Sequence, residues 1–273
     1  MLRFAVPDRF TSGLTRIPHQ ARVVAIIPAR YHATRLPGKP LALIDGQPML
    51  WHVYQRAKEA RLVDAVIVAT DDERIAEAIE QLGGNVVMTH ARHASGTDRL
   101  AEVAAALACE LVVNVQGDEP LISPDAIDAA VAPLLHNAAD VMGTLRKQLD
   151  NPADLAQPSV VKLVVDCDGY ALYFTRSPIP FVRPGHAAPV MWRHVGLYVY
   201  RREFLLKLAA LPQTPAELAE GLEQLRALEH GFRIRTVETT VDTIGVDTPE
   251  DLERVRRLVS LMKRQREEAG ARA

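Results

Sequence analysis

Short apolar runs alternate with amphipathic segments along the first half of this 273-residue chain. The apolar runs are four in number and have the length of strands: 23–27, 65–69, 86–88 and 111–115. The segments between them carry apolar residues at helical spacing, and a further helix is expected over about 124–137. Buried strands separated by helices are typical of a parallel sheet covered on both faces. The pattern therefore predicts an α/β fold with a Rossmann-like, mostly parallel sheet.

The character of the chain changes near residue 140. Strands are expected at 141–145, 160–165, 170–174 and 195–200. We interpret residues 140–200 as a smaller β-rich lobe, inserted into a single domain that spans residues 22–264. Helical patterns return at 204–211 and 216–228, and Thr248-Pro249 begins a final helix. Residues 1–21 are expected to form a disordered extension, with a transit-type peptide as the alternative, and residues 265–273 a frayed tail.

Composition limits the classes of function. The net charge is −2 and 48% of the residues are hydrophobic, which indicates a globular chain whose anion binding must be local rather than spread over a basic surface. We therefore expect no nucleic-acid partner. No run approaches the roughly 18 apolar residues that a membrane span needs, so no membrane insertion is expected either. Cys109 and Cys167 are far apart and lack a C-x-x-C context, and this fits a cytoplasmic location.

A cationic loop follows the first predicted strand. It carries Arg30, Arg35 and Lys39, together with Gly38, several prolines and no acidic residue. Such a loop at the carboxyl end of a strand can hold a polyphosphate with its charges and backbone N–H groups, although an ordinary solvated basic loop is the alternative. Neither G-x-G-x-x-G nor G-x-x-x-x-G-K-[ST] is present, so a dinucleotide oxidoreductase and a P-loop ATPase both lose support.

Two aspartates are candidates for a metal site. Asp118 follows the fourth predicted strand and a glycine, where no helix needs a cap. Asp247 stands just before the final helix, and a capping or dipole role is a strong alternative for it. Mg²⁺ is typically held by one or two carboxylates together with substrate phosphates, which is the arrangement that nucleotidyl transfer requires. The sequence alone leaves open whether the two carboxylates converge.

Several motifs stand in the chain in a specific order. They are P-A-R (28–30), T-R-L-P-G-K-P (34–40), S-G-T-D-R-L-A-E (95–102), V-N-V-Q-G-D-E-P (113–120), L-E-Q-L-R (222–226) and G-V-D-T-P-E-D-L (245–252). On these motifs the chain resembles the 3-deoxy-D-manno-octulosonate (Kdo) cytidylyltransferases over roughly residues 22–258. Asp98 stands where that family often has Glu, and residues 184–191 are less alike. The N-terminal extension lies outside the resemblance.

The resemblance implies a fold of the nucleotide-diphospho-sugar transferase type and a set of site residues. The implied catalytic residues are Arg30, Lys39, Asp118 and Asp247, the last two as ligands of Mg²⁺. The implied nucleotide-binding residues are Pro28, Ala29, Arg30, Arg35, Lys39, Ser95, Gly96, Arg99 and Gln116. The implied acceptor-sugar residues are Arg183, His194, Tyr198, Glu223 and Gln224.

The implied reaction is transfer of CMP from CTP to Kdo, which forms CMP-Kdo and pyrophosphate for lipopolysaccharide synthesis. A cytoplasmic homodimer, with the β-rich insert as its interface, is implied by the same resemblance. Three alternatives stay open: a cytidylyltransferase for another acidic sugar (a sialic acid or 8-amino-Kdo), a Rossmann-type oxidoreductase, and a non-catalytic nucleotide-binding or assembly protein. From residue types alone, His194, Tyr198 and the pair Glu223-Gln224 have ordinary structural interpretations, and only the resemblance favours a sugar site.

Overall fold

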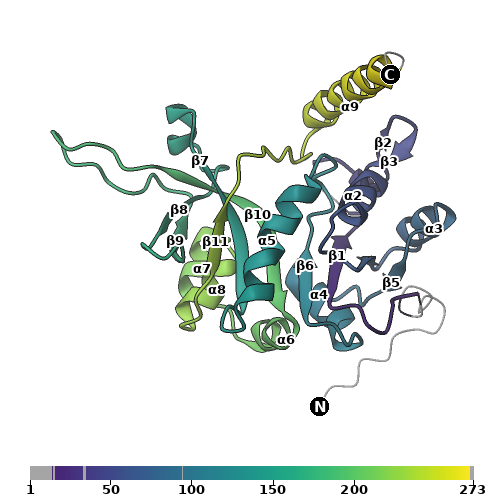
Figure 1. The fold of residues 1–273 in the computed structure, drawn as a ribbon, viewed down its shortest axis with the longest axis horizontal. Coiled ribbons are helices and arrows are strands. Elements are labelled where there is room, and N and C mark those ends of the chain that lie inside the picture. The colour runs from purple at the N-terminus through teal and green to yellow at the C-terminus, as the bar shows by residue number, and fades with distance from the viewer. Residues whose placement is uncertain (1–13, 15, 33–34, 94, 271–273) are drawn as a thin grey trace.

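The computed structural model describes residue 14 and residues 16–32, 35–93 and 95–270, with side chains up to residue 265. Its central sheet runs in the order β11-β7-β10-β6-β1-β4-β5 (Figure 1). These strands are β1 (Val23–Ala29), β4 (Ala65–Thr70), β5 (Val86–Met88), β6 (Leu111–Asn114), β7 (Met142–Gln148), β10 (Trp192–Arg201) and β11 (Arg235–Glu238). Neighbouring strands are parallel except where β10 pairs with β6 and β7. The predicted mostly parallel sheet is confirmed.

Helices cover both faces of the sheet. One face packs against α2 (Met49–Lys58), α3 (Glu73–Gln81) and α5 (Pro124–His136), and the other against α4 (Gly96–Ala105), α6 (Arg202–Ala210) and α8 (Gln224–Glu229). The strands of the sheet centre contribute to both cores, since Ala25 belongs to one and Ile26 to the other. Alternate side chains point to opposite faces of a strand, so a strand buried on both sides must be apolar throughout. This is why the first four strands read as continuous apolar runs.

The expected β-rich insert is divided between two places. β7 and β10 lie in the central order of the sheet, whereas β8 (Lys162–Val165) and β9 (Ala171–Thr175) branch from it through the pairing of β8 with β10, and residues 176–191 project beside them (Figure 1). The projecting part is the small antiparallel addition that was predicted. β10 is long enough to pair with β6 and β7 at one end and with β8 at the other. An alternating strand pattern does not reveal which sheet the strand will join.

The second half contains smaller departures from the expected helices. The helix expected over 216–228 is divided into α7 (Pro215–Glu220) and α8, because Gly221 between them adopts a left-handed φ of 62°. The last helix, α9 (Pro249–Gly270), includes residues 265–270, which were expected to fray. Its terminal residues are mostly Arg, Gln, Glu and Ala, all good helix formers. The rest of the expected tail, residues 271–273, lies outside the described residues.

The described end of the N-terminal extension is packed. Leu14 and Ile17 lie against the core cluster that includes Ala21, Leu107 and Cys109. These apolar side chains lie beside residues 106–109, which follow α4, so this part of the extension differs from the disorder that was expected. Residues 1–13 and 15 are outside the described part of the chain. The remaining short elements are η2 (Lys39–Leu41), β2 (Leu43–Ile44), β3 (Gln47–Pro48) and η3 (Pro152–Ala156).

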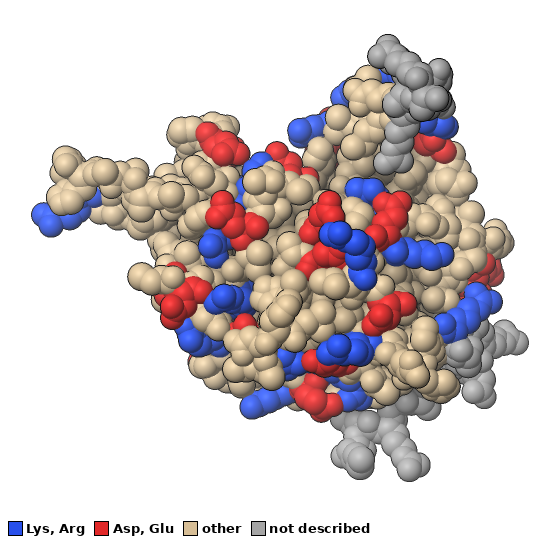
Figure 2. Space-filling model, viewed as in Figure 1, with Lys and Arg blue, Asp and Glu red and all other residues tan. Residues whose placement is uncertain are grey.

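The surface carries no large area of one charge on the side that Figure 2 shows. Basic and acidic side chains alternate across that face, in line with the net charge of −2. Within the described residues, every helix is too short or too polar to span a bilayer.

Candidate active site

Loops at the carboxyl ends of the parallel strands form one cleft. A cavity of about 190 Å³ lies over the end of β1 and is lined by Pro28, Ala29, Arg30, His32, Lys39, Pro40, Gln116, Gly117 and Asp118. A second cavity, of about 250 Å³, shares Pro28 and Gln116 with the first and extends toward α8. Ligands of open α/β sheets bind at this edge. We refer to the first cavity as the nucleotide side and to the second as the acceptor side, after the roles predicted for their residues.

Lys39 brings the two predicted metal carboxylates together. Its Nζ atom lies 2.8 Å from Oδ2 of Asp118 and 3.1 Å from Oδ1 of Asp247. A backbone hydrogen bond of 2.9 Å from Val246 N to Asp118 O joins the two loops. Arg35 adds a second cation, 3.0 Å from Oδ2 of Asp247. The convergence that the sequence left open therefore exists, with a cation between the carboxylates.

The charge on Lys39 is stabilised by this arrangement. Burial opposes the charged form of the amine, but the Asp118 and Asp247 carboxylates outweigh burial, and the pKa of Lys39 is raised above its ordinary value. The side chain is only 16% exposed, whereas those of Asp118 and Asp247 are 34% and 50% exposed. A largely buried ammonium thus lies between two partly exposed carboxylates, of which Asp118 lines the nucleotide side and Asp247 lines neither cavity.

The donor set fits a magnesium ion. The two carboxylates already approach one cation, Lys39, and hard oxygen ligands are those that Mg²⁺ prefers. No group of three or more His, Cys, Asp or Glu in the described chain could hold a metal by itself. Mg²⁺ commonly takes one or two carboxylates and completes its shell with phosphate oxygens and water.

The cationic loop is shaped by Tyr31. Gly38 has a left-handed φ of 70°, and a Cβ placed on it would lie 3.2 Å from the Tyr31 hydroxyl oxygen. The guanidinium carbon of Arg74 lies 3.3 Å from the centroid of the Tyr31 ring, and Arg74 is itself paired with Asp72 at the start of α3. Tyr31 is thereby fixed between Gly38 and α3, and this places Lys39 at the cavity. Thr34 of the predicted motif lies outside the described residues.

Arg30 connects this loop to α4. Its Nη2 atom donates hydrogen bonds to the carbonyl oxygens of His93, at 2.6 Å, and Ser95, at 3.2 Å. Ser95 is the N-cap of α4 and forms a reciprocal capping box with Asp98. An aspartate therefore serves where the family often has Glu, which explains how the departure is accommodated. Gly96 follows at the helix N-terminus and lines the acceptor side.

Arg99 does not reach the surface of the cleft. It is fully buried, lines neither cavity, and pairs with Asp71 at 3.2 Å and with Thr89. Burial lowers the pKa of its guanidinium, and Asp71 opposes that effect. Its place in α4 faces the sheet, so Arg99 ties together the ends of β4 and β5. Arg99 thus has a supporting position rather than a place on the cleft wall, and the predicted nucleotide-binding residues Arg35 and Ser95 also line neither cavity.

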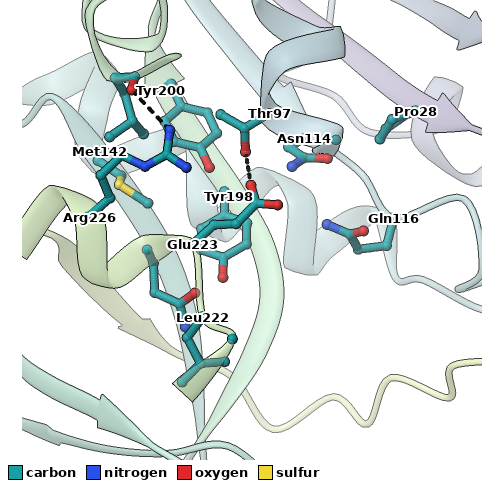
Figure 3. Close-up of a pocket in the computed structure, with 14 residues that line it drawn as sticks. Pro28, Thr97, Asn114, Gln116, Met142, Tyr198, Tyr200, Leu222, Glu223 and Arg226 are labelled. Atoms are coloured by element: carbon teal, nitrogen blue, oxygen red, sulfur yellow. Dashed lines mark hydrogen bonds between the residues drawn. The ribbon is translucent and has the colours of Figure 1, made fainter. Parts of the chain in front are cut away.

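The acceptor side holds three of the five predicted acceptor-sugar residues. Tyr198, Glu223 and Gln224 line it, together with Thr97, Asn114, Tyr200 and Arg226 (Figure 3). The turn at Gly221 lets the chain present Glu223 and Gln224 at the cavity. Gln224 Nε2 and Asn114 Oδ1 are buried and have no hydrogen-bond partner within the described chain, so both are available to a polar ligand.

Asn114, Thr97 and Tyr200 were not among the predicted site residues. One signal was present in the sequence, since Asn114 is the polar residue of an otherwise apolar strand. Thr97 and Tyr200 gave no such signal, because a Thr in the first turn of a helix and a Tyr in a strand are common.

The other two predicted acceptor-sugar residues differ in position. His194 lines neither cavity but lies next to Tyr198, with 5.3 Å between ring centroids, and its Nε2 atom is 2.9 Å from the Thr144 hydroxyl. Burial lowers the pKa of His194 to about 3, so the imidazole is neutral at ordinary pH. Arg183 is exposed on the projecting segment 176–191, and the structure does not bring it to the cleft (Figure 1).

Comparisons with known proteins identify the family of the chain. The family model described as Cytidylyltransferase matches residues 24–237. A 3-deoxy-manno-octulosonate cytidylyltransferase of Geobacter sulfurreducens is 56% identical over 243 residues, which are 85% of this chain and 97% of that protein. One from Solibacter usitatus is 55% identical over 237 residues, which are 87% of this chain and 94% of that protein.

Two solved structures are also similar to this chain. The structure of a CMP:2-keto-3-deoxy-manno-octonic acid synthetase complexed with CTP matches with a TM-score of 0.85 and 44% identity, over 89% of this chain and all of that chain. A cytidylyltransferase from Leptospira borgpetersenii has a TM-score of 0.60 at 19% identity, over 89% of this chain and 88% of that chain, and shows a shared fold. The chain belongs to the family of the 3-deoxy-manno-octulosonate cytidylyltransferases.

Proposed function

We propose that this protein transfers CMP from CTP to Kdo, forming CMP-Kdo and pyrophosphate. The observation that carries the proposal is the cluster of Lys39, Asp118 and Asp247 beside a cavity lined by Tyr198 and Glu223. The cluster suits a triphosphate, and the cavity suits a ligand with many hydroxyl groups. The similarity to a synthetase complexed with CTP supports the nucleotide assignment.

The nucleotide side would hold the triphosphate through three cations. Arg30 and Lys39 line the cavity, and Arg35 stands beside Asp247. Asp118 and Asp247 would hold Mg²⁺, which supplies further positive charge to the phosphates and lowers the pKa of an oxygen ligand. Lys39, now paired with these carboxylates, would then be free to contact phosphate oxygens. The base and ribose would lie where the two cavities meet, near Gln116, which lines both, and toward Gly96 of the acceptor side.

The acceptor side would orient the sugar by hydrogen bonds. Glu223 offers a carboxylate, Gln224 an amide and Tyr198 a phenol. Burial of the Tyr198 phenol raises its pKa well above the ordinary value, and the neighbouring Tyr200 and Glu223 raise it further. Tyr198 therefore stays protonated and can donate to an acceptor oxygen. His194, held neutral, would act by supporting Tyr198 rather than by pairing with the sugar carboxylate as a cation.

Catalysis would be mainly positioning and charge stabilisation. The 2-hydroxyl of the acceptor gives up its proton to water, and its oxygen forms the new bond to the α-phosphorus. The bond from that phosphorus to the pyrophosphate oxygen breaks on the opposite side, and pyrophosphate leaves. Arg30, Arg35 and Lys39 stabilise the negative charge that develops on the phosphate oxygens. The cleft holds the two substrates side by side, since the two cavities share Pro28 and Gln116.

The wider setting is also a proposal. Leu172 and Phe181 of the projecting part are 60% and 85% exposed, and they support a homodimer formed through this part. A cytoplasmic location and a role in lipopolysaccharide synthesis follow from the proposed substrates. Sedimentation velocity of the wild type and of Phe181→Ser would test the dimer.

The first experiment measures pyrophosphate release with CTP, Mg²⁺ and a panel of acidic sugars. Release with Kdo is the expected result. Release with a sialic acid or an amino analogue of Kdo alone would keep the reaction and change the acceptor. Tight CTP binding without release for every sugar would contradict the enzymatic function and favour a nucleotide-binding protein.

A further inference from the structure

A hydrogen bond joins the two sides of the cleft. Oγ1 of Thr97 donates to Oε2 of Glu223 over 2.5 Å, as Figure 3 shows. Thr97 lies in the first turn of α4, next to the predicted nucleotide residues Ser95 and Gly96, whereas Glu223 immediately precedes α8 on the acceptor side. The partners are 126 positions apart in the sequence, so the contact depends on the tertiary fold.

Thr97 is the fixed partner of this pair. It is 6% exposed, and the capping box of Ser95 and Asp98 holds the turn to which it belongs. Glu223 is exposed and follows the turn at Gly221, so its side chain has more freedom of its own. A hydrogen bond to a charged carboxylate is stronger than one between neutral groups. The threonine hydroxyl therefore sets the orientation of the carboxylate.

The orientation matters because of what surrounds the carboxylate. Glu223, Tyr198 and Tyr200 line the same cavity (Figure 3). In line with this placement, burial, then Tyr200 and then Glu223 raise the pKa of Tyr198, and burial and then Glu223 raise the pKa of Tyr200. With Oε2 engaged by Thr97, the second carboxylate oxygen is turned away from Thr97 (Figure 3). One oxygen is thus anchored, and the other can receive a hydroxyl group of a ligand.

We propose that Thr97 is a positioning residue for the acceptor site. Its hydroxyl holds the Glu223 carboxylate ready for a hydroxyl of the acceptor sugar and links acceptor binding to α4. Thr97 has no contact with the reacting atoms in this scheme and acts through Glu223. The inference rests on the proposed function and adds a residue that was not among the predicted site residues.

Two substitutions separate the hydroxyl from the shape of the side chain. Thr97→Val keeps the branched shape and removes the donor, and Thr97→Ser keeps the donor. For Thr97→Val we expect the KM for Kdo to rise about ten- to hundredfold, the range for losing a hydrogen bond to a charged group. The KM for CTP should change less than about threefold, and Thr97→Ser should restore the KM for Kdo to near the wild-type value.

A double-mutant cycle tests whether Thr97 acts through Glu223. In a Glu223→Ala background, Thr97→Val should change the KM for Kdo less than about twofold, because the partner is already absent. Full additivity of the two substitutions would overturn the proposal. An unchanged KM for Kdo in Thr97→Val would also overturn it. A third contradicting result is that Thr97→Val loses affinity for both substrates in parallel and melts at a lower temperature, which indicates a purely structural role.

Failure of the proposed function gives a different result. In that case the unmodified chain releases no pyrophosphate with CTP and Kdo, and the positioning role fails together with the function. If the unmodified chain is active and Thr97→Val behaves like it, only the positioning role is refuted.

Discussion

Lys39 and Asp118 form an ion pair of 2.8 Å across 79 positions of sequence, at the point where the cationic loop meets the end of β6. Asp247 contacts the same ammonium from a third segment of the chain. One lysine thus contacts both carboxylates that we propose as magnesium ligands, and its charge offsets the repulsion between them.

Asp118→Asn should separate activity from stability. The substitution preserves shape and removes the charge proposed to hold Mg²⁺, so we expect kcat to fall at least about a hundredfold, as when other groups that stabilise transition-state charge are lost. Lys39 retains Asp247 at 3.1 Å, and the unfolding free energy should fall by only about 1 kcal/mol. Steady-state pyrophosphate release and urea unfolding measure the two quantities.

Asp125→Asn provides the matched control. Its carboxylate is 83% exposed and forms a surface pair with Arg61 at 3.4 Å. Both kcat and stability should match the wild type, since such pairs contribute little. A kcat for Asp118→Asn within about fivefold of the wild type would refute the proposed metal role of this residue.

Removing divalent metal should stop the reaction and leave the fold intact. Lys39 already balances the two carboxylates, so folding does not depend on an added cation. With EDTA we expect no pyrophosphate release, an unchanged far-ultraviolet circular dichroism spectrum and a melting temperature within about 2 °C of the untreated protein. A large drop in the melting temperature would show that the metal is structural, and undiminished turnover would show that no metal is needed.

Gly38→Ala should impair CTP binding through the shape of the cationic loop. Gly38 and Gly46 both have left-handed φ, at 70° and 79°, but an added Cβ meets Tyr31 only at Gly38 and finds nothing within 4 Å at Gly46. Each alanine should therefore cost about 1 kcal/mol of stability from backbone strain. Only Gly38→Ala should raise the KM for CTP, by about tenfold or more, because the added Cβ meets Tyr31 and shifts the backbone that leads into Lys39. An equal KM in both variants would refute the role of Tyr31 in shaping the loop.

His194 should make stability fall with acidification. Its folded-state pKa of about 3 lies below the ordinary value of 6.5, so the unfolded state binds more protons between these values. The stability that depends on neutral His194 is therefore fully present above about pH 6.5 and is lost as the pH falls toward 3. By pH 5 the free energy of unfolding should have fallen by about 2 kcal/mol on account of His194. Urea unfolding at pH 7.5 and pH 5 should show a smaller loss for His194→Gln than for the wild type.

The control for this experiment is His136→Gln, an exposed substitution at the end of α5. It should follow the wild-type dependence on pH. If His194→Gln loses as much stability as the wild type between the two pH values, His194 is protonated in the folded protein, and the neutral imidazole beside Tyr198 is disproved.

Local patterns in the sequence were sufficient for the first half of the fold. The strand at Val23–Ala29 and its neighbours are apolar enough to be recognised, and Asp72 and Ser95 are N-cap residues of the types that mark helix starts. The cationic loop was also visible, because three basic residues follow a buried strand and no acidic residue interrupts them. These features depend on residues that are neighbours in the chain.

What the sequence determined by itself is the set of elements and the chemical types at the ends of the strands. Only the tertiary structure decided which of these residues meet. It placed Asp118 and Asp247 around Lys39, buried Arg99 under the loops, left Arg183 on the projecting segment and joined Thr97 to Glu223. The physical reason is that hydrogen-bonding and apolar patterns act over a few residues. Contacts between residues 79 to 208 positions apart depend on how the sheet and its helices pack as a whole.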